Sequence, residues 1–145
     1  MPDVAPRVRE SVPWWQAVLA RADARDRPDE RTWSPLEYAC HVRDVCHVFD
    51  ERLVLMLEHD DPAFANWDQD VTAVEERYAE QDPARVADEL AAEAEAIAGR
   101  FAAVRPDRAD RSGRRSNGSV FTVTTLAQYF LHDLVHHEHD VGAAP

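Results

Sequence analysis

The chain has 145 residues, 45% of them hydrophobic, which predicts one globular domain, residues 1–145, with room for a hydrophobic core. Its 28 acidic residues outnumber its 16 basic residues, all of them arginine, and the formal net charge is −12. This acidity argues against nucleic acid as a partner, because affinity for a phosphate backbone depends on cationic contacts. No apolar stretch approaches the roughly 20 residues of a membrane span, so no membrane partner is expected either.

The first half of the chain predicts two main helices. One is expected over about residues 11–24, with Ser11 as its cap. The other, over about residues 34–59, has the clearer start. Ser34 and Glu37 form a capping box, and proline occupies the first helical position between them. Apolar residues then follow at helical spacing: Val42, Cys46, Phe49, Leu53 and Met56.

The second half predicts a short polar helix and two more main helices. The short helix is expected over about residues 70–80. The third main helix begins at Asp82 and ends before Pro106, and its apolar residues recur every three or four positions. A long surface loop rich in Arg, Asp, Ser and Gly is expected over about residues 106–119. The fourth main helix is expected over about residues 122–141.

These helices predict an all-α fold. The sequence has no run of β-branched and aromatic residues bounded by tight turns, so no strand is expected. Four amphipathic helices bury their apolar stripes most simply against one another, as a four-helix bundle. The large aromatic side chains are assigned to packing, and the tryptophans are given no role in a site.

The two cysteines, Cys40 and Cys46, lie six positions apart in one predicted helix. Their Cα atoms would be about 9 Å apart, which is too far for a disulfide. We therefore predict two reduced thiols that pack in the core, in a reducing compartment. Because no export signal is evident near the start of the sequence, a cytoplasmic location is expected.

Histidines gather near the end of the sequence. Four of the seven fall in the last fourteen residues, at His132, His136, His137 and His139. His132 and His136 are four positions apart and project from one face of the predicted helix, so they can offer two nitrogen ligands to a divalent metal. A tight site needs a third ligand from another helix, and His41 is the candidate. The alternative is that these histidines only form a polar helix face.

Two short segments resemble the DinB-like superfamily, which includes the YfiT-type metal-dependent hydrolases. They are residues 33–44, WSPLEYACHVRD, and residues 132–137, HDLVHH. The resemblance implies an up-up-down-down four-helix bundle that binds a divalent metal ion, zinc or nickel, through His41, His132 and His136. Because the superfamily includes thiol transferases that use bacillithiol or mycothiol, it also implies a metal-dependent transferase or hydrolase. The substrate would be a small molecule, with a low-molecular-weight thiol as co-substrate.

Three histidine ligands would leave a coordination position open for a thiol or a water whose pKa the metal lowers. Asp44 would then orient an imidazole and Tyr129 would donate a proton. The alternatives are an arginine ion pair for Asp44 and a packing role for Tyr129. The competing hypothesis is a non-catalytic metal-binding or stress-response module, closed by a fourth ligand such as His139. Family members often pair, and an exposed Trp14-Trp15 doublet also predicts a homodimer.

Overall fold

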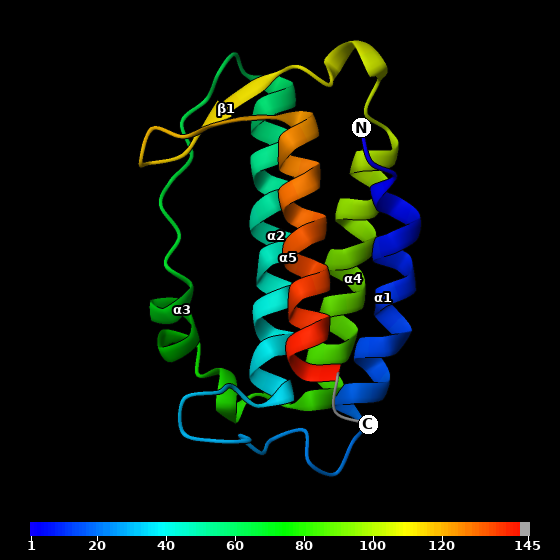
Figure 1. Ribbon diagram of the computed structural model, residues 1–145, viewed down its shortest axis with the longest axis vertical. Helices are drawn as coiled ribbons and strands as arrows, with labels where there is room; N and C mark the ends of the chain where they lie inside the picture. The colour runs from blue at the N-terminus through cyan, green and yellow to red at the C-terminus, as the bar shows by residue number, and fades with distance from the viewer. Residues whose placement is uncertain (143–145) are drawn as a thin grey trace.

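The computed structural model describes residues 1–142, and four long helices form its body (Figure 1). These helices are α1 (Val4–Leu19), α2 (Pro35–Glu58), α4 (Pro83–Ala102) and α5 (Val123–Gly142). The shorter elements are α3 (Gln69–Glu75), two 3₁₀ turns (Tyr78–Glu80 and Pro106–Arg108) and two strands, β1 (Ser112–Arg114) and β2 (Val120–Thr122). The predicted four-helix bundle is confirmed.

The helices form a ring in which α4 lies between α1 and α2, and α5 covers the opposite side between the same two helices. In Figure 1, α1 and α5 run down the page and α2 and α4 run up it. Read round the ring from α4 through α2 and α5 to α1, the directions are up, up, down, down. In the order of the chain they are down, up, up, down. The long connection between α2 and α4 carries α3 along the outside of α2.

The start of α2 is as predicted, and the start of α1 is not. The Ser34 hydroxyl accepts a hydrogen bond from the Glu37 amide at 3.1 Å, and the Glu37 carboxylate accepts one from the Ser34 amide at 3.1 Å. By contrast, Ser11 does not cap a helix. It is buried inside α1, where its hydroxyl donates to the Val8 carbonyl at 2.7 Å. The helix begins earlier because Val4 and Val8 are buried and extend its apolar stripe toward the N-terminus.

The expected loop at residues 106–119 contains part of a small β-hairpin, so the all-helical prediction missed one element. β1 and β2 pair antiparallel, with Gly113 opposite Phe121. The loop after α2 adds to this hairpin, because the Phe64 amide donates to the Arg114 carbonyl at 2.7 Å. Strands of three residues are too short to show a period-2 pattern, and here tertiary packing stabilises them. Gly113 is buried against Phe64 and Met56.

One hydrophobic core joins all four long helices. Trp15 is fully buried in it, while Trp14 is half-buried and meets the Trp15 ring edge-on at 4.9 Å. The expectation of an exposed tryptophan doublet is therefore wrong, and the homodimer stays a prediction without that support. Cys40 and Cys46 are buried free thiols, as predicted. Within residues 1–142, none of the helices is both long enough and apolar enough to span a membrane.

Candidate metal centre

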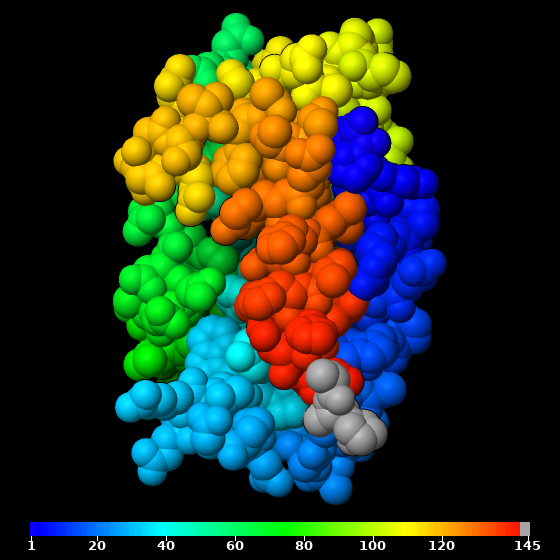
Figure 2. Space-filling model, in the orientation of Figure 1, coloured from blue at the N-terminus to red at the C-terminus, as the bar shows by residue number. Residues whose placement is uncertain are grey.

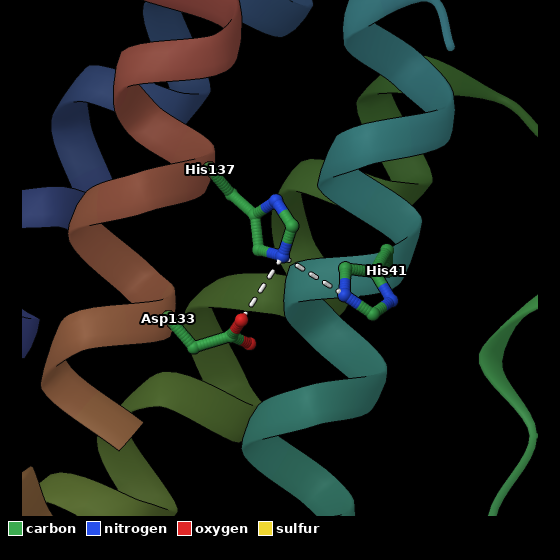
Figure 3. A group of neighbouring side chains, drawn as sticks. All are labelled: His41, Asp133 and His137. Carbon is green, nitrogen blue, oxygen red and sulfur yellow. Dashed lines mark hydrogen bonds and ion pairs between the residues drawn. The ribbon is translucent and has the colours of Figure 1, made fainter. Parts of the chain in front are cut away.

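Three side chains with metal-binding atoms converge between α2 and α5 (Figure 3). His41 comes from the second turn of α2, and Asp133 and His137 come from successive turns of α5. The Nε2 atom of His137 lies 3.1 Å from Nε2 of His41 and 3.3 Å from Oδ1 of Asp133. One ligand atom from each residue lies within 4.8 Å of the other two. The cluster therefore offers two imidazole nitrogens and one carboxylate oxygen around a common point.

His41 is held uncharged in this cluster. It is only 1% exposed, and its ring lies between Trp33 at 5.4 Å and Trp67, which is stacked on it at 5.7 Å. Burial, with a smaller contribution from the nearby His137, lowers the pKa of His41 to about 4. Its Nδ1 atom is buried without a hydrogen-bond partner in the described part of the chain. At neutral pH His41 therefore has a nitrogen lone pair available for a cation.

Two carboxylates orient His137. Burial disfavours its charged form, but the hydrogen-bonded Asp133 and the neighbouring Asp140 outweigh this effect, and the pKa of His137 lies above its ordinary value. Burial likewise disfavours the Asp133 carboxylate, but His137 compensates and the pKa of Asp133 lies below its usual range. The Nδ1 atom of His137 is 3.2 Å from Oδ2 of Asp140. A carboxylate at Nδ1 directs the Nε2 lone pair of a histidine toward a metal, as outer partners of metal ligands commonly do.

The distances within the cluster suit a divalent cation. Zinc ligands at about 2.0–2.1 Å in tetrahedral geometry lie about 3.3 Å from one another. The separations at His137 Nε2, 3.1 Å to His41 and 3.3 Å to Asp133, are close to that value. Imidazole and carboxylate ligands suit zinc, nickel and other divalent transition metals. The residues present therefore fit a metal ion.

Of the three ligands predicted from the sequence, only His41 belongs to this cluster. His132 and His136 are exposed on the outer face of α5, with their rings stacked 6.4 Å apart. They are neighbours, as their spacing predicts, but the structure does not bring them to His41. His139 is also exposed and is not part of the cluster. Whether His132 and His136 bind a metal stays an untested prediction.

The phase of α5 is the feature of the sequence that identifies Asp133 and His137. The buried stripe of this helix consists of Val123, Leu126, Ala127, Phe130, Leu134 and Val141. At 3.6 residues per turn, His132 lies about 180° and His136 about 140° from the centre of that stripe. Asp133 and His137 lie about 80° and about 40° from it. The D-x-x-x-H pair therefore faces the bundle, and the H-x-x-x-H pair one position earlier faces away.

Other residues considered from the sequence also have defined places. Asp44 accepts a hydrogen bond from Arg43 Nε at 3.0 Å and another from the Tyr78 hydroxyl, and does not hydrogen-bond an imidazole in the structure. The arginine ion pair considered as its alternative role is thus present. Tyr129 is partly exposed and stacks on Phe49 at 5.8 Å. The tryptophans were assigned no role in a site, but Trp33 and Trp67 flank His41.

Two cavities border the cluster. One, of about 200 Å³, is lined by Asp133, Trp67 and Tyr129, among others. The other, of about 240 Å³, is lined by His137, Trp33 and Tyr38, among others. The cluster therefore borders space on two sides in which a small molecule could reach it.

Comparisons with known proteins agree with this architecture. Residues 6–141 match the sequence profile of the DinB superfamily. A similar solved structure is YfiT from Bacillus subtilis, described as a probable metal-dependent hydrolase with an unusual four-helix bundle topology. The two structures have a TM-score of 0.80 and 16% sequence identity, over 94% of this chain and 81% of that chain. Among curated proteins, no sequence relative is found.

Proposed function

This chain is a member of the DinB superfamily, and we propose that it is a metal-dependent enzyme whose divalent cation is held by His41, Asp133 and His137. The convergence of three donor atoms from two helices carries the proposal. Zinc and nickel are the metals that this donor set and the superfamily favour. The proposed set keeps His41 from the sequence prediction and takes its two partners from the face of α5 that points into the bundle.

The protein side chains prepare the site for a cation. Protons compete only weakly with a metal ion for the His41 imidazole, because the pKa of His41 is about 4. Asp133 contributes a negative charge that attracts a cation. Asp140 holds the His137 ring in place through Nδ1. A bound cation supplies Lewis acidity and lowers the pKa of a coordinated water or thiol.

Access to the cluster favours an enzyme over a closed structural site. Structural zinc sites use four protein ligands, whereas catalytic sites leave a position for water or substrate. Within residues 1–142 the cluster contains three candidate ligands, and His139, the residue expected to close a structural site, is not among them. The two bordering cavities place space for a small molecule next to Asp133 and His137.

The proposed reactions are transfer of a low-molecular-weight thiol, of the mycothiol or bacillithiol type, or hydrolysis. The chain itself offers no reactive thiol, since burial raises the pKa of Cys40 to about 12 and also raises that of Cys46. Any thiol chemistry at this site therefore needs a thiol from solution. This need supports a small-molecule co-substrate over a cysteine nucleophile.

Metal binding by single variants tests the ligand set. His41→Ala, Asp133→Ala and His137→Ala should each lower zinc and nickel affinity by more than the about 10- to 100-fold typical of losing an outer partner. His132→Ala and His136→Ala are the matched controls, because they remove the same side chain from the exposed face of the same helix. Elemental analysis of natively purified protein and competition with a chromophoric chelator provide the measurements. If His41→Ala and the two control variants lost metal while Asp133→Ala and His137→Ala kept it, the three-histidine set predicted from the sequence would replace this one.

Activity is tested separately from metal binding. The native protein is incubated with an electrophile and either mycothiol or bacillithiol, and hydrolysis of ester and amide substrates is followed without thiol. We expect chelation to abolish turnover and added zinc or nickel to restore it. A rate that survives both chelation and His137→Ala would rule out the metal-dependent mechanism. Full metal occupancy without turnover of either substrate type would favour the non-catalytic module.

A further inference from the structure

The cavity of about 200 Å³ beside Asp133 also contains two arginines. Arg52 comes from α2, and Arg115 follows β1 in the hairpin. The hairpin and the connection between α2 and α4 lie on the same edge of the molecule, beside α2 and α5 (Figures 1 and 2). This cavity is smaller than the about 300–1,000 Å³ typical of sites for drug-sized ligands, so its occupant would be small.

Neither arginine is paired with an acid. Throughout residues 1–142, no carboxylate oxygen lies within 4.0 Å of the side-chain nitrogens of Arg52 or Arg115, although most other arginines of this acidic chain form such pairs. Each guanidinium carries about five N–H donors. Arg52 donates one long hydrogen bond, from Nη2 to the Ala65 carbonyl at 3.4 Å. Most of the donors are therefore available to a ligand.

Aromatic rings hold the two guanidinium groups in place. Arg52 lies over Phe49 at 5.5 Å and over Phe64 at 5.2 Å. Arg115 lies over Phe121 at 5.8 Å and over Tyr129 at 5.9 Å. Stacking uses the faces of a guanidinium and leaves the N–H groups on its edges free for a planar, bidentate anion.

The arginines also repel one another. Burial and the positive charge of Arg115 lower the pKa of Arg52 below its ordinary value. Two positive charges in one cavity destabilise the protein unless an anion binds between them and offsets their repulsion. Asp133 lines the same cavity and hydrogen-bonds His137, so it serves the cluster rather than the arginines.

We propose that Arg52 and Arg115 bind the carboxylate of a small organic acid, and that this acid is the substrate class of the enzyme. The assignment of this acid as the substrate rests on the proposed function, because it places the reacting end of the acid at the candidate metal cluster while the arginines bind its carboxylate. A singly charged carboxylate suits the cavity better than a doubly charged phosphate, because the Asp133 carboxylate would repel the phosphate more strongly. The aromatic walls, Phe49, Phe121 and Tyr129, suit an acid with a planar apolar body.

Benzoate is the probe, and benzamide is its uncharged counterpart of the same shape. Both are titrated by calorimetry into the full chain after its metal has been removed and the chelator dialysed away, so that carboxylate coordination to a metal cannot contribute. We expect benzoate to bind at least about tenfold more tightly than benzamide. Arg52→Gln and Arg115→Gln should each weaken benzoate binding by about tenfold or more.

Arg25→Gln is the matched control, because Arg25 is also without a carboxylate partner within residues 1–142 but lies in the connection between α1 and α2, outside this cavity. It should bind benzoate like the unchanged protein. Arg115 lies on the half-buried hairpin, so its variant keeps the test valid if Arg52→Gln fails to fold. Equal affinities for benzoate and benzamide, or unchanged benzoate binding by a folded Arg115→Gln, would overturn the proposal.

The metal content of the same proteins, measured before the metal is removed, separates this inference from the proposed function. Metal content should be unchanged in Arg52→Gln and Arg115→Gln, because neither residue belongs to the cluster. If the chain bound benzoate through the arginines but bound no metal, only the proposed function and the assignment of the acid as substrate would fail. If metal bound as proposed but the arginine variants kept full benzoate affinity, only the carboxylate subsite would fail.

Discussion

Replacing Gly113 with alanine should destabilise the protein, because the hairpin lies directly against the side chains beneath it. A Cβ atom at this position would lie 2.4 Å from Cζ of Phe64 and 2.9 Å from Cγ of Met56. Carbon atoms pack best at about 3.5–4.0 Å, so both neighbours would have to move by about 1 Å. Phe64 and Met56 are both buried, which leaves them little room to do so.

The expected loss can be worked out from these contacts. Forcing an extra carbon into a packed site costs about 1–3 kcal/mol. Alanine is intrinsically better than glycine in a strand by about 0.5–1 kcal/mol. The net loss in free energy of unfolding is therefore expected to be about 1 kcal/mol, within a range of about 0–2.5 kcal/mol. Because Phe64 also supports Arg52 at 5.2 Å, its displacement should reach the arginine cavity.

Gly99→Ala provides the matched control. Gly99 lies inside α4, and a Cβ atom there would meet nothing within 4 Å. The substitution should stabilise the protein by up to about 1 kcal/mol, because alanine is the better helix former. Urea unfolding of both variants measures the difference, with the m-value checked for constancy. A Gly113→Ala variant as stable as Gly99→Ala would refute the close packing of the hairpin.

Two further predictions concern the caps and surface charges of the bundle. Ser34→Ala should lower the free energy of unfolding by about 1 kcal/mol in urea titrations, because the Glu37 amide loses its acceptor, whereas Ser34→Thr should retain most of the stability. His47→Gln tests a pH dependence. Burial lowers the pKa of His47, but Glu93 and Glu51 outweigh it and the pKa lies above its ordinary value near 6.5. The stabilisation from protonated His47 is complete below about pH 6.5 and is lost as pH rises through the higher folded-state pKa. The variant should therefore differ from the unchanged protein in thermal melts at pH 5.5 and match it at pH 9, and a difference independent of pH would contradict this assignment.

Local sequence features predicted the long helices where their signals are themselves local. The capping box at Ser34 and the proline after Asp82 mark helix starts through bonds within a few residues, and α2 and α4 begin there. Ser11 was misleading because a serine inside a helix and a serine cap look alike until the partners of the hydroxyl are known. The hairpin was missed because its stability comes from Phe64 and Met56, which are distant in sequence.

The sequence by itself determined the class of fold, the family resemblance and one member of the candidate metal cluster, His41. It also contained the phase of α5 that turns Asp133 and His137 toward the bundle, since that phase follows from the spacing of the buried stripe. Only the tertiary structure decided which residues on that inward face of α5 meet His41, because this depends on how α5 is seated against α2. The same holds for Arg52 and Arg115, which come together because long-range packing joins the hairpin to α2 and α5.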